Sequence, residues 1–201
     1  MPDFASDRLA PARGELILGG QKSGKSHRAE SLVRCWLAQS AGHRAVLIAT
    51  ARGDDDEMRA RIRRHRADRA LRVPALAVVE EPLELASVIR AHHRADTLLV
   101  VDCLTLWLTN LVWSGHRPHG DAPAMPGDPA PATAALLQSV VAAPGPWVLV
   151  SNEIGLGVIP MGREVRAFCD ALGLLNQQVA QVCERVTLMV AGLPLVLKGT
   201  A

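Results

Sequence analysis

One stretch, residues 19–26, constrains the fold of this chain more than any other. It matches G-x-x-x-x-G-K-[ST], a pattern that cradles phosphate groups, with Gly19, Gly20, Gln21, Lys22, Ser23, Gly24, Lys25 and Ser26. The apolar run at residues 15–18 predicts a buried strand before it, and the helical spacing of apolar residues over 26–38 predicts a helix after it. Strand, glycine-rich loop and helix form the context that this motif needs, so the sequence predicts nucleotide binding.

The residue types in this loop explain how it would hold phosphate. Glycines let the backbone turn tightly and approach a ligand closely. The N–H groups that open the following helix form a site for anions. We therefore expect Lys25 at the β- and γ-phosphates of a nucleoside triphosphate and the Ser26 hydroxyl at Mg²⁺.

Length and composition predict one domain of ordinary globular character. We expect residues 1–14 to be a flexible leader and residues 15–201 to form one catalytic domain. The net charge of +2 argues against a general nucleic-acid binder, and two Phe with no Tyr argue against base stacking. There is no signal-peptide core, no apolar run of membrane-spanning length and no zinc-like cysteine spacing. A cytoplasmic protein with free thiols is expected.

Strand-like and helix-like segments alternate along the rest of the chain. Further strands are expected at residues 45–50, 75–79, 97–102, 147–151, 186–190 and 194–197. Helices are expected at residues 83–94, 104–112, 133–143 and 163–184. Another helix should run from Asp54, an N-cap with Glu57 as its capping-box partner, to Pro74. Residues 114–131 are rich in Pro and Gly and predict a surface loop.

This alternation predicts an α/β fold with a mainly parallel sheet and helices on both faces. Ligands on such sheets bind at the carboxyl ends of the strands. The phosphate loop, Thr50, Glu80, Asp102 and the pair at 152–153 should therefore share one edge. For Asn152 and Glu153 the pattern leaves two possibilities open, contact with a substrate or metal and a helix-capping or structural role.

Two residues carry the chemistry that this edge could perform. Asp102 ends an apolar strand, as does the acid that holds Mg²⁺ in phosphate-loop proteins, although such an Asp can also cap a helix. His65 shares one helix face with Arg61 and Arg69, four residues away on either side. Such a face is either a solvated basic surface or a nucleophilic imidazole among phosphate-binding arginines.

The segments that accompany the loop are distinctive. The sequence D-D-E-M…R-I…H-R-A-D-R occupies residues 55–69, and N-E-x-G-x-G-x-x-P occupies residues 152–160. With residues 48–51, 80–83, 101–105, 108–111, 176–177 and 191–194, they resemble the bifunctional adenosylcobinamide kinase/adenosylcobinamide-phosphate guanylyltransferases of cobalamin biosynthesis. The resemblance runs from residue 15 to residue 198 and implies a RecA-like phosphate-loop fold and a homotrimer.

The resemblance also implies the chemistry and the residues that perform it. A triphosphate, ATP or GTP, would phosphorylate adenosylcobinamide, and GTP would then guanylylate His65 and release pyrophosphate. The GMP would pass to adenosylcobinamide phosphate, with Mg²⁺ held by Ser26 and Asp102. Nucleotide contacts are implied for the phosphate loop and for Ala49, Thr50, Ala51, Arg66, Ala67, Asp68, Arg69, Glu80 and Asp102.

Several readings stay open at this point. The chain could be a phosphate-loop kinase of another small molecule, with His65 only part of a basic face. It could also be a nucleotide-dependent switch that transfers nothing. The residue that corresponds to the family's acidic nucleotide contact is either Glu80 or Glu81, and Ala70 stands where the family usually has Pro.

Overall fold

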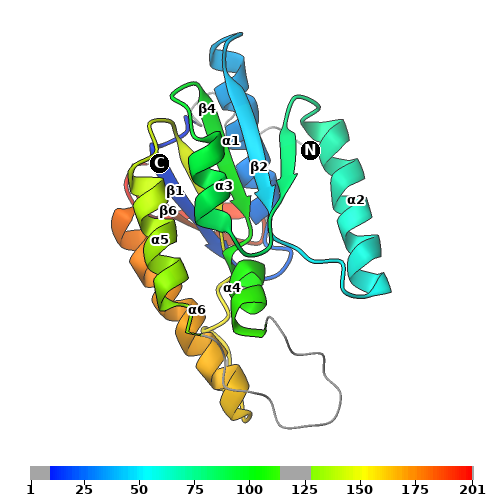
Figure 1. The fold of residues 1–201 in the computed structure, drawn as a ribbon, viewed down its shortest axis with the longest axis vertical. Helices are drawn as coiled ribbons and strands as arrows, with labels where there is room; N and C mark the ends of the chain where they lie inside the picture. The colour runs from blue at the N-terminus through cyan, green and yellow to red at the C-terminus, as the bar shows by residue number, and fades with distance from the viewer. Residues whose placement is uncertain (1–9, 114–127, 201) are drawn as a thin grey trace.

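The computed structural model describes residues 10–113 and 128–200. Its centre is a seven-stranded sheet with the order β3-β2-β4-β5-β1-β6-β7 (Figure 1). The strands are β1 (Gly14–Gly19), β2 (Arg44–Ala49), β3 (Ala77–Glu80), β4 (Thr97–Asp102), β5 (Trp147–Val150), β6 (Arg185–Val190) and β7 (Leu193–Lys198). All pairs are parallel except β6 with β7, which confirms the mainly parallel sheet.

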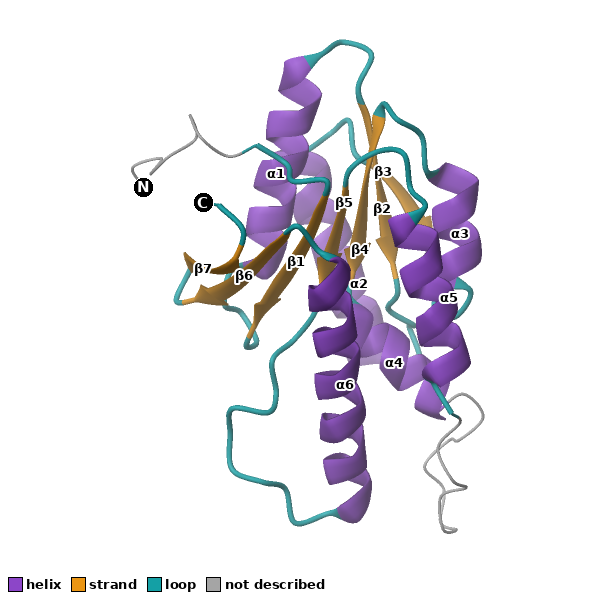
Figure 2. Ribbon diagram, turned by 90° about the vertical axis from the view of Figure 1, so that its left-hand side faces the viewer, coloured by secondary structure: helices purple, strands orange, loops and turns teal. Residues whose placement is uncertain are grey.

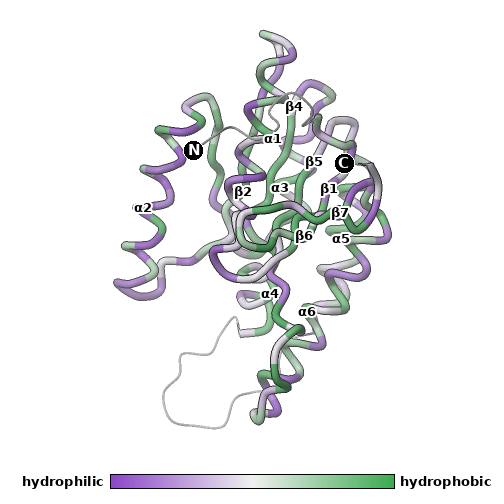
Figure 3. Tube along the Cα trace, turned by 180° about the vertical axis from the view of Figure 1, so that it is seen from behind, coloured by the Kyte–Doolittle hydropathy of each residue, from purple (hydrophilic) through white to green (hydrophobic). Residues whose placement is uncertain are grey.

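Helices cover both faces of the sheet, as expected (Figure 2). They are α1 (Lys25–Gln39), α2 (Asp56–Arg72), α3 (Leu85–His92), α4 (Leu104–Trp113), α5 (Ala130–Val141) and α6 (Arg163–Val182). One core cluster joins the sheet to α3, α4, α5 and α6, and a second joins the opposite face to α1. The strands are accordingly the most hydrophobic part of the trace (Figure 3), and this burial supplies the main driving force for folding.

A buried carboxylate fastens α1 to the strand that precedes the phosphate loop. Glu15 of β1 is fully buried, and its oxygens accept hydrogen bonds from Arg28 Nε of α1 at 2.8 Å and Thr187 Oγ1 of β6 at 2.9 Å. Arg185 Nη1 donates to the second oxygen at 3.2 Å. Because buried charges need such partners, this cluster fixes the two elements that flank the loop.

The expected start of α2 was wrong by one residue. Asp55, not Asp54, is the N-cap, and its Oδ1 accepts a hydrogen bond from Met58 N at 2.6 Å. Asp54 instead pairs with Arg52 at 3.4 Å. Three consecutive Asp residues each suit a cap, so the sequence alone does not choose among them. With the cap at Asp55, Glu57 is one position short of the capping-box site.

Other expected boundaries also differ, most clearly at the starts of α5 and β1. α5 begins at Ala130 rather than at residue 133, because Pro131 lies in the first turn, where a missing N–H costs no helical hydrogen bond. Residues 130 and 131, which were expected in the loop at 114–131, therefore belong to α5. Residues 114–127 of that loop lie outside the described part of the chain. β1 begins at Gly14, which belonged to the expected leader, and Arg13 N donates to Glu184 Oε2 at 2.8 Å.

Candidate functional site

A cavity of about 690 Å³ lies at the carboxyl edge of the sheet, where the sequence placed the polar strand ends. The phosphate loop, α2 and the ends of β2, β3, β4 and β5 enclose it. It is lined by Gln21, Lys22, Ser23, Gly24, Lys25, Ser26, Ala49, Ala51, Arg61, His65, Arg66, Arg69, Glu80, Asp102, Cys103 and Asn152, among others. The structure thus brings most of the predicted site residues together.

The phosphate loop has the backbone that its motif predicts. Gly24, the residue before α1, has a φ of 103°, which favours glycine. A Cβ at Gly19 would lie 2.5 Å from both Met189 O and Ser23 Oγ, so this position also needs glycine. Gly19 and Gly20 contribute their carbonyls, which accept hydrogen bonds from Lys25 Nζ at 2.9 and 2.7 Å.

Lys25 holds its ammonium group in the cavity. Burial lowers the pKa of Lys25, and Arg61 acts in the same direction, while Cys103 and Asp102 oppose the shift. Its two carbonyl partners belong to the loop itself, so they satisfy the ammonium group until a ligand supplies stronger acceptors. A phosphate oxygen is such an acceptor, because charge-assisted hydrogen bonds are about twice as strong as neutral ones.

The oxygens expected at Mg²⁺ lie side by side. Ser26 Oγ donates to Asp102 Oδ2 at 3.3 Å, and Arg69 Nη2 lies 3.7 Å from the same carboxylate oxygen. In the described residues, no three His, Cys, Asp or Glu side chains gather as a metal site. The protein therefore offers two hard oxygen ligands here, a set that suits Mg²⁺ bound jointly with phosphates and water.

The arginine-rich helix α2 turns one face to the cavity. Arg61, His65 and Arg69 all line it, as their spacing of four predicted. His65 is exposed to the cavity and its imidazole makes no hydrogen bond to a described residue. Ala67 and Asp68, which the family resemblance implied as contacts, are exposed but are not among the residues that line the cavity.

Ion pairs to α1 hold α2 in this position, and no local sequence pattern predicts them. Glu30 of α1 is 3% exposed, and its Oε2 lies 2.7 Å from Arg72 Nε. Its Oε1 lies 4.0 Å from Arg69 Nε, and Arg69 in turn reaches Asp102. Figure 1 shows α2 beside the β3 edge, and among its described residues only Arg69 is buried. These contacts rather than apolar packing therefore place the His65 face.

Glu80 and Glu81 have different roles in the structure. Glu80 lines the cavity and forms an ion pair with Arg66. Glu81 Oε1 instead accepts hydrogen bonds from the backbone of Leu83 and Glu84 at 2.8 and 2.9 Å, which orders the turn before α3. Glu80 is therefore the carboxylate that faces a ligand in this cavity.

The Thr50 side chain has a structural role and does not line the cavity. It is completely buried, and its hydroxyl donates to Cys103 O at 2.7 Å and accepts from Cys103 N at 2.9 Å. Thr50 therefore joins the ends of β2 and β4, while Ala49 and Ala51 on either side line the cavity.

Cys103 is a cavity residue that sequence reasoning did not single out. Burial, and next the Asp102 carboxylate, raise the pKa of its thiol to about 11. The thiol therefore stays protonated at neutral pH, where it is a poor nucleophile.

Comparison with known sequences decides the family. The profile described as "Cobinamide kinase / cobinamide phosphate guanyltransferase" matches residues 15–197. This chain belongs to that family. It is 46% identical over 185 residues to the "Bifunctional adenosylcobalamin biosynthesis protein CobP" of Pseudomonas aeruginosa, covering 92% of this chain and 97% of that one. It is 35% identical to the Escherichia coli "Bifunctional adenosylcobalamin biosynthesis protein CobU", covering 91% and 98%.

Solved structures support the fold of this cobinamide kinase family member. The flagellar accessory protein FlaH from Methanocaldococcus jannaschii matches with a TM-score of 0.51 at 11% identity, over 95% of this chain and 80% of that one. The ATPase EscN of enteropathogenic E. coli matches with a TM-score of 0.52 at 14% identity, over 90% and 43%. The RecA-like phosphate-loop fold is thus confirmed. In the part of the chain that the structure describes, no helix is long and apolar enough to span a membrane.

Proposed function

We propose that this protein performs both reactions of its family on a corrinoid substrate. In the first, the hydroxyl oxygen of adenosylcobinamide attacks the γ-phosphorus of a triphosphate, ATP or GTP, and the nucleoside diphosphate leaves. In the second, an imidazole nitrogen of His65 attacks the α-phosphorus of GTP. The P–N bond forms as the bond to pyrophosphate breaks. A phosphate oxygen of adenosylcobinamide phosphate then displaces the imidazole and yields adenosylcobinamide-GDP.

One observation carries this proposal: the phosphate loop and His65 line the same cavity. A triphosphate seated on the loop has its charge next to Lys25, Arg61 and Arg69, which can stabilise the charge of the transferring group. The test is incubation with adenosylcobinamide, ATP, GTP and Mg²⁺, followed by chromatography. Both adenosylcobinamide phosphate and adenosylcobinamide-GDP are expected; nucleotide consumption that ignores adenosylcobinamide would contradict the proposal.

Ser26 and Asp102 would hold Mg²⁺ in both reactions. Bound there with the phosphates, the ion would neutralise part of their negative charge. Arg69 lies beside the same carboxylate and would compete with the ion for it in the absence of nucleotide. The expected cytoplasmic location goes with this proposal, because both triphosphates and Mg²⁺ are available there.

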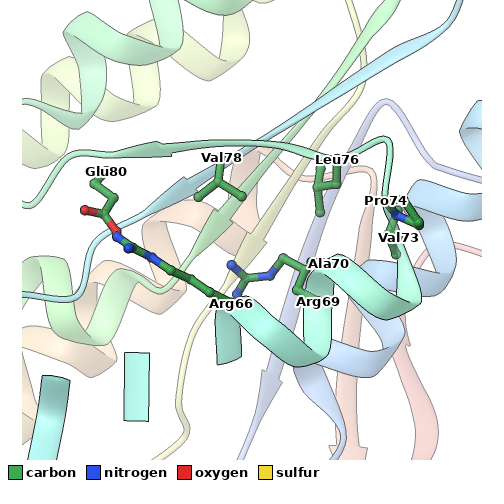
Figure 4. Close-up of a pocket in the computed structure, with 8 residues that line it drawn as sticks. All are labelled: Arg66, Arg69, Ala70, Val73, Pro74, Leu76, Val78 and Glu80. Atoms are coloured by element: carbon green, nitrogen blue, oxygen red, sulfur yellow. The ribbon is translucent and has the colours of Figure 1, made fainter. Parts of the chain in front are cut away.

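A smaller cavity supports GTP as the nucleotide of the second reaction. It measures about 560 Å³ and opens between α2 and β3 (Figure 4). It is lined by the apolar residues Ala70, Val73, Pro74, Leu76 and Val78 and by the charged residues Arg66, Arg69 and Glu80. A purine fits the apolar walls, and guanine presents N–H donors at the edge where a carboxylate accepts. Adenine lacks this pair of donors.

Substitution Glu80→Gln should therefore weaken the preference for GTP over ATP. Hydrogen bonds to charged groups contribute about 1.5–3 kcal/mol, so the GTP/ATP affinity ratio should fall about 10- to 100-fold. Competition binding with labelled GTP measures that ratio. Glu81→Gln is the matched control, because its remaining oxygen can still cap the α3 turn. An unchanged ratio in Glu80→Gln would remove Glu80 from guanine recognition.

The homotrimer that the family resemblance implies also belongs to this proposal. β7 is an edge strand of the sheet, and Val190, Leu193, Leu195 and Leu197 of the β6–β7 hairpin are all more than half exposed. An apolar edge strand of this kind is suited to contact with another copy of the chain. Analytical ultracentrifugation should give three times the 21.5 kDa chain mass; a mass of one chain at working concentration would refute the trimer.

A further inference from the structure

Asn152 follows β5 and lines the cavity together with the phosphate loop. β5 is placed between the phosphate-loop strand β1 and the Asp102 strand β4, and its last residue Val150 pairs with both. The pairing with β1 continues past the strand, because Ser151 N donates to Ile17 O and Glu153 N donates to Gly19 O. Asn152 is therefore held level with the first residue of the loop.

The backbone of Asn152 is clamped from two helices. Its N–H donates to Thr105 Oγ1 of α4 at 2.9 Å, and its carbonyl accepts from Asn176 Nδ2 of α6 at 3.1 Å. Both clamping side chains are buried. Burying a polar side chain costs free energy unless it forms hydrogen bonds. These two hydrogen bonds therefore indicate that the orientation of the Asn152 backbone is important for function.

The carboxamide of Asn152 itself is free for a ligand. The side chain lines the cavity with Lys25, Ser26 and Asp102, and it makes no hydrogen bond to a described residue. Beneath it, the buried atoms Ser151 Oγ and Asn176 Oδ1 also find no partner among the described residues. The region behind Asn152 is thus polar, which is unusual for the interior end of a buried strand.

The geometry points to a specific role: Asn152 binds the terminal phosphate of the nucleoside triphosphate, and Asn176 and Thr105 are positioning residues for it. This inference rests on the proposed seating of the triphosphate on the phosphate loop. The loop N–H groups would hold the inner phosphates, Lys25 would reach the β- and γ-phosphates, and Ser26 and Asp102 would hold Mg²⁺ on one side. The space over the end of β5 then receives the γ-phosphate. There the side-chain carboxamide of Asn152 can donate an N–H hydrogen bond to a γ-phosphate oxygen.

The test is the affinity for GTP relative to GDP, each with Mg²⁺, in the full-length protein. GDP lacks the terminal phosphate, so Asn152→Ala should bind GDP as the wild type does and bind GTP about 10- to 100-fold more weakly. Asn152→Asp has the same shape, and its negative charge should reduce GTP affinity still further. Equal losses for GTP and GDP, or an unchanged ratio, in both variants would overturn the role.

The positioning residues have their own readout. Asn176→Ala removes the clamp on the Asn152 carbonyl and should lower the GTP/GDP affinity ratio in the same direction, by a smaller factor. Gln177→Ala, at the exposed neighbouring position on α6, is the matched control and should leave the ratio unchanged. Neither measurement requires guanylyl transfer, so failure here is distinct from failure of the histidine mechanism.

The kinetics should follow the binding. Removing one preorganised donor from developing charge typically costs 10²- to 10³-fold in kcat. The rate of adenosylcobinamide phosphorylation should fall by about that factor in Asn152→Ala, with little change in the KM for adenosylcobinamide. A rise in that KM at unchanged kcat would place Asn152 at the corrinoid instead and overturn the assignment.

Discussion

Substitution His65→Ala should abolish formation of adenosylcobinamide-GDP while GTP still binds. The imidazole of His65 is the proposed attacking group. The Cys103 thiol has a pKa of about 11 and stays protonated, and the other histidine that lines the cavity, His27, lies on α1 rather than on the arginine-rich face of α2. A rate loss of at least about 10³-fold is expected. The rate is measured with adenosylcobinamide phosphate and GTP, and GTP affinity is measured separately.

The control for this variant is His92→Ala. His92 ends α3 and is not among the residues that line the cavity, so its loss should change neither rate nor affinity. The His65 face carries little packing, since only Arg69 of α2 is buried, and the variant should therefore fold normally. Unimpaired transfer in His65→Ala would refute the proposed nucleophile.

Substitution Lys25→Ala should have the second large effect, on both reactions. The ammonium group donates to the loop carbonyls of Gly19 and Gly20 and would exchange these for phosphate oxygens. Loss of charge-assisted hydrogen bonds to phosphate, about 1.5–3 kcal/mol, predicts a GTP affinity about 10- to 100-fold lower. Lys25→Arg should not rescue it, because the position is buried and a guanidinium group is larger and planar.

Lys198→Ala provides a matched control for Lys25→Ala. Lys198 Nζ also donates to two backbone carbonyls, those of Ala180 and Gln181, at 2.9 and 3.0 Å. It lies on β7, away from the cavity, so its loss removes the same kind of contact without touching a phosphate site. Equal effects of the two substitutions on GTP affinity would show that Lys25 acts only through the stability of its loop.

Local signals in the sequence predicted the phosphate loop, the parallel sheet and the cavity face of α2. The loop motif needs only eight consecutive residues, and the spacing of Arg61, His65 and Arg69 needs only one helix. Asp102 was found because a polar residue ends an apolar strand. Each of these inferences depends on neighbours in sequence, where period and residue type carry the information.

Contacts between distant elements could not be predicted in this way. Glu30 forms an ion pair with Arg72, 42 residues further along the chain. No pattern in either segment predicts the other as its partner. The clamp of Asn176 on Asn152 spans 24 residues and uses a backbone carbonyl, which has no sequence signal at all. The cap at Asp55 was missed for a different reason: neighbouring Asp residues offered equivalent local choices.

Capture of a covalent intermediate tests the guanylyl-histidine mechanism most directly. The wild-type protein is incubated with α-labelled GTP and Mg²⁺, denatured, and counted for label that stays on the protein. The label on the wild-type protein should be stable at alkaline pH and released in acid, as expected for a phosphoramidate, and His65→Ala should carry no label. Bound GTP without any covalent label on the wild type would contradict the guanylyl-histidine mechanism.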